Sequence, residues 1–329
     1  MPRAGLVTLT AAALVVAGCG SKQDALSPES GASRGIATLW WKMLVGSALG
    51  LGIVALILLA AWIRRNRAGV PGVREGDRVA LGVVIGLGIV VPIAVLSGLF
   101  VFGNVFLIRK TTMPTAAAAV RDRPELTVRV VGHQFWWEVR YPGTPAVTAN
   151  EIHIPVRTNV RVLVSTDDVI HSFWVPELNR KIDMIPEQTN QVLLYADRPG
   201  RYRGQCAEFC GLQHAHMGLY VFADPPAVFR RWLDGQSKPA PAAGSRLFVD
   251  KCGSCHTIRG TPATSRVGPD LTHVGSRTSL AALTIPNTPA RLREWLRDPQ
   301  RVKPGNQMPR VELTDAQIRR LVAYLEARR

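Results

Sequence analysis

Two long stretches without a charged residue constrain this chain more than any other feature. Residues 44–63 and 79–108 are apolar, and Pro92 interrupts the second stretch. A helix needs roughly 20 apolar residues to cross a bilayer core about 30 Å thick, so both stretches are long enough. The arginine-rich connector between them favours the cytoplasmic side. The sequence therefore predicts a transmembrane hairpin over residues 36–110, with the rest of the chain outside the cytoplasm.

The N-terminal 19 residues have the pattern of an export signal. Arg3 gives a positive start, and the apolar stretch 6–16 is too short to span a bilayer. The run VAGC at residues 16–19 resembles a bacterial lipobox, in which the cysteine is lipidated. We expect a lipoprotein-type signal peptide over residues 1–19 with Cys19 as the lipidation site. A plain signal peptide that contains a cysteine is the alternative.

Length and composition limit the number of units and the kinds of partner that this chain can have. A chain of 329 residues is expected to hold two or three units. Its 40 Lys+Arg against 24 Asp+Glu give a net charge of +16, but these residues are spread along the chain without a long basic block. Basic composition of this kind is weak support for nucleic-acid binding, and we expect no nucleic-acid partner.

The part after the hairpin changes from a strand pattern to a helix pattern. The predicted strands cover residues 126–131, 151–154, 160–165, 191–195 and 218–222. Many short strands at this spacing are typical of an all-β sandwich or barrel. Residues 225–244 are expected to form a short helix up to 234 and then a Pro/Ala linker. Helices are predicted over residues 291–297 and 314–329, the last with Thr314 as N-cap.

The first metal motif is a Cys-x3-Cys-x3-His-x2-Met run made by Cys206, Cys210, His214 and Met217. Thiolate and thioether ligands select copper over magnesium or calcium. A mononuclear blue-copper site needs one cysteine, so the second is better explained by two thiolates that bridge two copper ions. A further histidine is then required, and His171 is the best candidate. The alternative is a Cys206–Cys210 disulfide, which leaves the histidine and methionine unexplained.

This motif resembles the dicopper (CuA) loop of cytochrome c oxidase subunit II. The order around it is similar too: a two-helix hairpin, the run VGHQFWW at residues 131–137, the His171 segment and then the cysteine loop. The resemblance covers roughly residues 36–224 and implies a cupredoxin sandwich over residues 120–224. The implied copper ligands are His171, Cys206, Cys210, His214, Met217 and the backbone carbonyl of Glu208. The Glu208 side chain is also implied to approach a magnesium ion shared with subunit I.

The sequence departs from this family at two places. The family usually has Trp where Phe135 stands, as the aromatic that receives the electron, so Phe135, Trp136 and Trp137 are the candidates here. A core role explains Trp137 equally well. The acidic residue that the family carries in its second membrane helix has no counterpart in residues 79–108. Three histidines without a partner set are expected to be structural, namely His133, His153 and His216.

The second metal motif is Cys252-x-x-Cys255-His256, the attachment signature of haem c. Two thioether bonds hold the porphyrin, and His256 is positioned as the proximal iron ligand. Met308 and His273 are the candidates for the distal ligand, and we favour Met308 because Met/His ligation raises the reduction potential. A thioredoxin-like dithiol would need neither the histidine nor this helical context.

Residues 245–329 resemble an all-α class I cytochrome c domain, with the run GPDL at residues 268–271 matching that family's loop on the histidine side of the haem. The resemblance implies subunit II of a proton-pumping cytochrome c oxidase, fused to its own electron donor. Electrons would arrive at haem c, pass to the dicopper centre and reach subunit I, where dioxygen is reduced to water. No catalytic residue is then expected on this chain.

The implied partners are subunit I with haem a and copper B, subunit III, membrane lipid, and an external donor that is a soluble cytochrome c or a cytochrome bc complex. The expected location is the bacterial plasma membrane, with both metal domains on the periplasmic side. Two other functions stay open: the electron-receiving subunit of a nitric oxide reductase, and a membrane-tethered electron shuttle. Nitrous oxide reductase would need a propeller for which the chain has no room, and quinol oxidase subunit II lacks the two copper cysteines.

Overall fold

The computed structural model describes residues 23–65, 78–108, 125–239 and 245–329. These residues fall into two compact units. One consists of Arg34–Met113, and the other combines Met1–Ser33 with Pro114–Arg329. The predicted signal peptide and its Cys19 lie outside the described residues.

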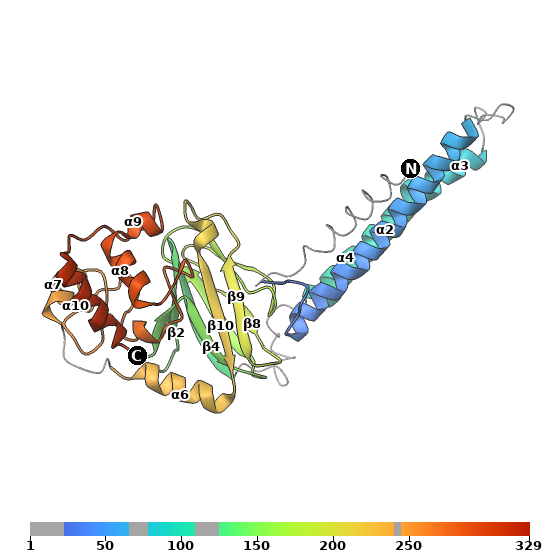
Figure 1. The fold of residues 1–329 in the computed structure, drawn as a ribbon. Coiled ribbons are helices and arrows are strands. Elements are labelled where there is room, and N and C mark those ends of the chain that lie inside the picture. The colour runs from blue at the N-terminus through green and yellow to red at the C-terminus, as the bar shows by residue number, and fades with distance from the viewer. Residues whose placement is uncertain (1–22, 66–77, 109–124, 240–244) are drawn as a thin grey trace, which may run out of the picture. The chain divides into compact units, whose positions relative to one another are not determined.

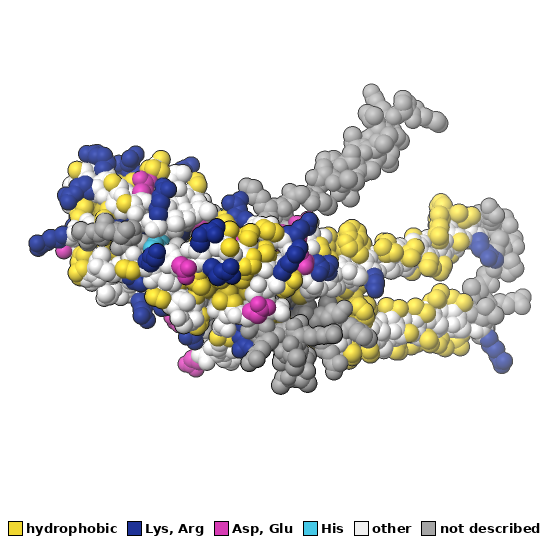
Figure 2. All heavy atoms as spheres, turned by 90° about the horizontal axis from the view of Figure 1, so that it is seen from below, with side chains coloured by type: hydrophobic (Ala, Val, Ile, Leu, Met, Phe, Trp, Pro, Cys, Tyr) yellow, Lys and Arg dark blue, Asp and Glu magenta, His cyan; other side chains and the backbone are white. Residues whose placement is uncertain are grey.

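The smaller unit holds the two predicted apolar helices. The first is α2 (Gly31–Arg65). The second is built from α3 (Arg78–Ile85), the π-helical turns η1 (Gly86–Val90) and η2 (Phe102–Leu107), and α4 (Val91–Val101) between those turns. Both helices are long and apolar enough to cross a membrane, and their apolar stretches are not buried by other described residues. Apolar side chains cover much of the visible surface of both helices (Figure 2).

The larger unit begins with a sandwich of two five-stranded sheets (Figure 1). The first sheet has the order β3-β2-β1-β5-β8 and the second has the order β4-β10-β9-β6-β7. The strands of the first sheet are β1 (Leu126–His133), β2 (Trp136–Arg140), β3 (Val147–Ala149), β5 (Val160–Thr166) and β8 (Asn190–Leu194). Those of the second are β4 (Glu151–Pro155), β6 (His171–Trp174), β7 (Ile182–Met184), β9 (Gly200–Cys206) and β10 (Gly218–Asp224).

The sandwich core comes from alternating side chains. Strand β5 buries every second residue, as a strand with one face on a core must. The five predicted strands are present as β1, β4, β5, β8 and β10, and the all-β prediction is confirmed. The sequence does not predict β2, β3, β6, β7 and β9. Two of these are only three residues long, and β9 carries Arg201 and Arg203 among its residues, which weakens its hydrophobic signal.

Helix α6 (Pro226–Ser237) follows the sandwich and corrects the predicted start of the linker. The sequence predicts a helix that ends at residue 234, but the helix continues to Ser237. Gln236 is buried and donates a hydrogen bond from Nε2 to Ser276 Oγ, and Ser237 Oγ donates to the carbonyl of Leu233. These tertiary and local contacts extend the helix through a segment whose composition indicates a loop.

The C-terminal domain, residues 245–329, is helical as predicted. Its helices are α7 (Arg246–Cys252), α8 (Pro289–Arg297), α9 (Pro299–Val302) and α10 (Asp315–Glu326), joined by η4 (Val274–Ser276) and the short strands β11 (Ser279–Leu280) and β12 (Ile285–Pro286). Thr314 caps α10 as predicted, in a reciprocal pair of hydrogen bonds with Gln317. A separate apolar cluster that includes Phe248, Leu292 and Leu321 forms the core of this domain.

A core truncation far from the cysteines tests the sandwich packing. Ile154→Ala is expected to lower the free energy of unfolding by about 2–5 kcal/mol, because Ile154 is fully buried and the lost side chain leaves a cavity. Val228→Ala, at a position 38% exposed on α6, is the control and should change it by less than about 0.5 kcal/mol. Urea unfolding of the detergent-purified chain measures both. Equal stability losses in the two variants would contradict this packing.

Candidate metal centres

The cysteine loop, residues 204–217, begins on the last residues of β9 and ends immediately before β10. Cys206 is the final residue of β9, and Met217 immediately precedes β10. The third element is β6, whose first residue is His171. Because β6 pairs with β9, His171 is brought next to the cysteine loop although it lies 35 positions from Cys206. The predicted copper-binding side chains therefore come together at one end of the second sheet, from strands β6 and β9 and from the cysteine loop.

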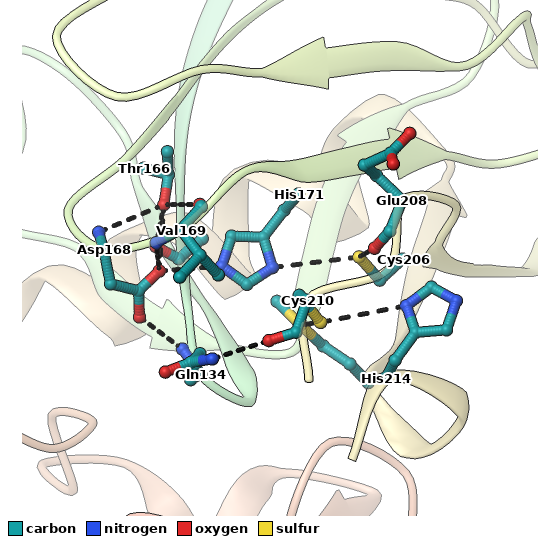
Figure 3. Close-up of polar contacts among 11 residues, drawn as sticks. Gln134, Thr166, Asp168, Val169, His171, Cys206, Glu208, Cys210 and His214 are labelled. Carbon is teal, nitrogen blue, oxygen red and sulfur yellow. Dashed lines mark hydrogen bonds and ion pairs between the residues drawn. The ribbon is translucent and has the colours of Figure 1, made fainter. Parts of the chain in front are cut away.

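Each cysteine has its own histidine and its own weaker donor (Figure 3). Cys206 Sγ lies 3.8 Å from His171 Nδ1 and 3.1 Å from the carbonyl oxygen of Glu208. Cys210 Sγ lies 3.8 Å from His214 Nδ1 and 3.8 Å from Met217 Sδ. The ligand atoms of His171, Cys206 and Cys210 all lie within 4.8 Å of one another. The donors therefore form two similar halves, which fits two ions better than one.

Asp168 orients His171. His171 Nε2 lies 2.8 Å from Asp168 Oδ1, so its hydrogen is donated there and Nδ1 faces the thiols. The backbone N–H groups of Gln134 and Val169 also donate to this carboxylate, both at 2.6 Å. Burial opposes ionisation of Asp168, but these hydrogen bonds outweigh it and lower its pKa to about 2. His171 is fully buried, so its ring has little freedom to turn away.

The two loop cysteines are buried, free thiols rather than a disulfide. A hydrogen bond from Cys210 lowers the pKa of Cys206, and His171 adds to this effect. The same hydrogen bond and burial raise the pKa of Cys210. The pair therefore readily holds negative charge on sulfur, which is the form that binds a metal. Soft sulfur and imidazole donors of this kind fit copper.

The turn between β1 and β2 connects the cysteine loop with a second site. Gln134 Nε2 donates to the carbonyl oxygen of Cys210 at 2.6 Å. A Cβ at Gly211, the next residue, would lie 3.2 Å from the edge of the Phe135 ring, so that ring packs directly on the loop. Trp137 is fully buried, and its Nε1 donates to the carbonyl of Met217 at 3.3 Å. Sequence reasoning assigned no role to Asp168 or Gln134. The hydrogen bond between them and the bond from Gln134 to Cys210 join residues that are 34 and 76 positions apart in the chain.

The second site is a largely apolar cavity in the C-terminal domain, here called the cytochrome cavity. Its lining includes Cys252, Cys255, His256, Met308, Phe135 and Trp136, but neither Trp137 nor His273. His256 Nδ1 donates to the carbonyl of Pro269 at 2.8 Å, which leaves Nε2 as the ring's lone-pair nitrogen. A Cβ at Gly268 would meet the His256 ring at 2.6 Å, so only glycine lets the backbone lie against that ring. These residues fit a haem held by two thioethers and a histidine.

Met308 and His273 occupy different environments. Gln300 Nε2 donates to the Met308 carbonyl at 2.9 Å, and the Met308 N–H donates to Asn306 Oδ1 at 2.8 Å, which fixes the backbone at the cavity. His273 is buried, and its ring nitrogens lie 3.1 Å and 3.0 Å from the carbonyl oxygens of Arg329 and Lys238. The geometry therefore favours Met308 over His273 as the distal ligand.

The three histidines that were expected to be structural each have a partner, and for His216 the partner is Gln213, whose Oε1 lies 2.8 Å from Nδ1. His133 stacks on Trp136 with ring centroids 4.4 Å apart, and His153 stacks between Phe222 and Trp232 at 4.7 Å and 3.9 Å.

The Glu208 carboxylate points away from the thiols while its carbonyl faces Cys206 (Figure 3).

Comparisons with known proteins match both domains. The family described as "Cytochrome C oxidase subunit II, periplasmic domain" matches residues 146–223, and the family "Cytochrome c" matches residues 241–328. Cytochrome c oxidase subunit 2 of Alkalihalophilus pseudofirmus is 36% identical over 209 residues, 61% of this chain and 60% of that protein. The same subunit of Bacillus sp. strain PS3 is 34% identical over 224 residues, 62% of this chain and 63% of that protein.

Among solved structures, the periplasmic domain of subunit II of cytochrome oxidase from Bradyrhizobium japonicum is 30% identical to this chain. The match covers 34% of this chain and 93% of that one, with a TM-score of 0.33. This chain spans about three-fifths of the length of the curated relatives named above.

The described residues thus combine two long apolar helices, a sandwich that carries two paired thiols, and a helical domain that carries the Cys-x-x-Cys-His motif. The family comparisons make this specific, because the sandwich and the C-terminal domain each match a described family. Residues 146–223 are therefore similar to the periplasmic domain of cytochrome c oxidase subunit II, and residues 241–328 are similar to cytochrome c.

Proposed function

We propose that this chain is the subunit of a proton-pumping cytochrome c oxidase that receives electrons at its own haem c and passes them through a dicopper centre to subunit I. The paired arrangement of the cysteine loop carries this proposal. Each thiol has one imidazole at 3.8 Å and one weaker donor, a carbonyl for Cys206 and a thioether for Cys210. A mononuclear copper site would use only one of the two halves.

The copper ligands would be His171, Cys206, Cys210, His214, Met217 and the carbonyl of Glu208. Cys252 and Cys255 would hold haem c covalently, with His256 and Met308 as axial ligands. When bound, the haem and the copper pair each accept and release one electron. The chain's own residues hold these groups rigidly: Asp168 fixes the tautomer of His171, and the Pro269 carbonyl fixes that of His256.

Phe135 and Trp136 are the proposed aromatics between the two centres. Both line the cytochrome cavity, and the Phe135 ring packs on Gly211, the residue after Cys210. Gln134 adds a hydrogen bond from its side chain to the Cys210 carbonyl. Trp137 does not line the cavity and packs against His171 and Phe173, so a core role explains it better.

The partners and location follow from the family. Subunit I with haem a and copper B would receive the electron and reduce dioxygen to water, and subunit III would complete the complex. The Glu208 carboxylate, which points away from the thiols, would approach a magnesium ion shared with subunit I. The two apolar helices would anchor the chain in the bacterial plasma membrane, with both metal domains on the periplasmic side and Cys19 lipidated. A soluble cytochrome c or a cytochrome bc complex would be the donor.

Purification from native membranes tests this proposal against a membrane-tethered shuttle and against a nitric oxide reductase subunit. We expect the chain to copurify with a subunit that contains haem a, and the complex to consume dioxygen with reduced cytochrome c. Isolation of the chain without haem a, or with a partner that reduces nitric oxide but not dioxygen, would overturn the oxidase assignment.

Transfer between the two centres is expected to depend on ionic strength less than reduction of the haem by an external protein donor does. The donor must find its docking surface by diffusion, and salt screens the charges that help it. The two domains of this chain are already in contact, so no diffusional encounter is needed. Stopped-flow spectroscopy between low and high salt measures both steps. A steep salt dependence of the internal step would contradict a fixed contact.

A further inference from the structure

Lys303 lies in the C-terminal domain directly after α9 and is only 2% exposed. Its Nζ donates to three backbone carbonyl oxygens: Phe135 at 3.0 Å, His216 at 2.9 Å and Ala281 at 2.9 Å. An ammonium group has three N–H donors, so each one has an acceptor. The acceptors belong to three separate segments, which are the β1–β2 turn, the cysteine loop and the C-terminal domain itself.

We propose that Lys303 is a positioning residue that fixes the cytochrome c domain on the cysteine loop and thereby sets the gap between the two metal centres. The inference about the domain contact stands on the chain's own hydrogen bonds. Only its consequence for electron transfer rests on the proposed function.

The segment that supplies the Ala281 carbonyl has an unusual backbone. Ala281, Ala282 and Leu283 have φ values of 53°, 56° and 65°, a left-handed conformation that residues with a side chain rarely adopt. Of the carbonyls in this turn, Ala282 accepts from the Gly218 N–H of the sandwich at 3.2 Å, and Ala281 accepts from Lys303 within the C-terminal domain. Strained backbone of this kind persists where surrounding contacts hold it in place, and it is concentrated at functional sites.

Two further contacts join the C-terminal domain to the sandwich. Gln213 Nε2 donates to the carbonyl of Pro304 at 2.6 Å, next to Lys303. The N–H and Oγ1 of Thr278 both donate to Glu151 Oε1, at 2.7 Å and 2.6 Å. Lys303 differs from these contacts because its one group joins the β1–β2 turn and the cysteine loop at the same time.

The position of Lys303 relates it to the proposed transfer route. Phe135, whose carbonyl accepts from Lys303, also lines the cytochrome cavity and packs on the cysteine loop. His216, the second acceptor, precedes Met217. Loss of the three hydrogen bonds would free the turn and the loop to move apart from the C-terminal domain. Electron transfer would slow because its rate depends on this gap.

The ammonium group of Lys303 is buried. Burial lowers the pKa of its ammonium group to about 7, while the three carbonyl oxygens around Nζ each favour the charged form by accepting a hydrogen from it. An uncharged apolar side chain here would remove the Lys303 donor from the carbonyl oxygens of Phe135 and His216, and burying unpaired polar groups is unfavourable. The Ala281 carbonyl would keep the hydrogen bond that it accepts from Thr284 Oγ1.

Hydrogen exchange on the purified full chain tests the domain contact directly. In Lys303→Met we expect the amides of Gly218 and Thr278, which donate across the contact, to exchange about tenfold faster or more. The amide of Val162, inside the sheet on β5, should be unchanged. Lys251→Met, the same substitution at an exposed lysine of α7, is the matched control and should change none of these amides.

A second variant covers the case that the methionine prevents folding. Lys303→Gln has a smaller side chain with a donor amide, and its exchange rates at Gly218 and Thr278 should fall between those of the native chain and the methionine variant. Native exchange rates at both amides, in whichever variant folds, would overturn the role of Lys303.

The second readout separates positioning from a merely structural role. With metal content unchanged, Lys303→Met should slow transfer between the centres about tenfold while a small chemical reductant reduces the haem at the native rate. Slowing of both steps together, or of neither, would contradict the inference. A native chain that binds no copper would overturn the proposed function alone, because the exchange result needs no metal.

Discussion

Replacement of Cys206 or Cys210 by serine is expected to abolish transfer to the copper centre while leaving the haem attached. Each thiol is a member of one Cys–His half of the site, and a shared pair of ions needs both thiolates. Loss of a residue that merely orients a ligand typically costs 10–100-fold in metal affinity, so loss of a ligand itself should exceed about 100-fold. Copper analysis and the optical spectrum of each purified variant measure the two effects separately.

The control for this pair of variants is Ala215→Ser in the same loop, at an exposed position that offers no donor to the site. It should retain native copper content and native transfer rates. Near-normal copper and turnover in Cys206→Ser or Cys210→Ser would show that the two thiols are not bridging ligands.

Replacement of both Cys252 and Cys255 by alanine is expected to have the opposite effect. No haem should remain on the chain after denaturation, and reduction by the external donor should be lost. The copper content should be native, since these cysteines line the cytochrome cavity and the proposed copper donors lie on the sandwich. Haem staining on a denaturing gel and copper analysis of the same sample provide the measurement.

Ser254→Ala is the matched control for the haem variant, because Ser254 lies between the two cysteines and is not one of the residues that line the cavity. Its haem should remain covalently bound. If the double alanine variant still carried covalent haem, or if it lost copper as well, the division of the four cysteines between two centres would be wrong.

The candidate residues of each proposed centre could be selected from the sequence because most of them are close together in the chain. Cys206, Cys210, His214 and Met217 lie within twelve positions, and Cys252, Cys255 and His256 lie within five. The bound metal or haem imposes this spacing, so the pattern can be recognised in a single sequence. His171 and Met308 had to be inferred from the few histidines and methionines that were left.

The residues that support the centres could not be predicted in the same way. Gln134 and Lys303 act through hydrogen bonds to partners far along the chain, and each is an ordinary polar residue in its local sequence. A signal for Asp168 was present, as an acidic residue three positions before His171. Lys303 gave no signal, because a lysine next to proline and glycine indicates an exposed turn.

The fold shows the same difference between features that are visible in the local sequence and features that depend on distant partners. Strand β5 alternates buried and less buried residues and was predictable, whereas the three-residue strands β3 and β7 exist because neighbouring strands pair with them. The continuation of α6 to Ser237 depends on the contact of Gln236 with Ser276, which composition does not show.

Metal analysis of the full chain, purified from native membranes and then separated from the other subunits, tests the central claim most directly. The account predicts two copper ions and one iron per chain, with a paramagnetic resonance signal from one unpaired electron shared by two copper nuclei. Zinc in place of copper, or a chain whose single iron is its sole transition metal, would contradict it.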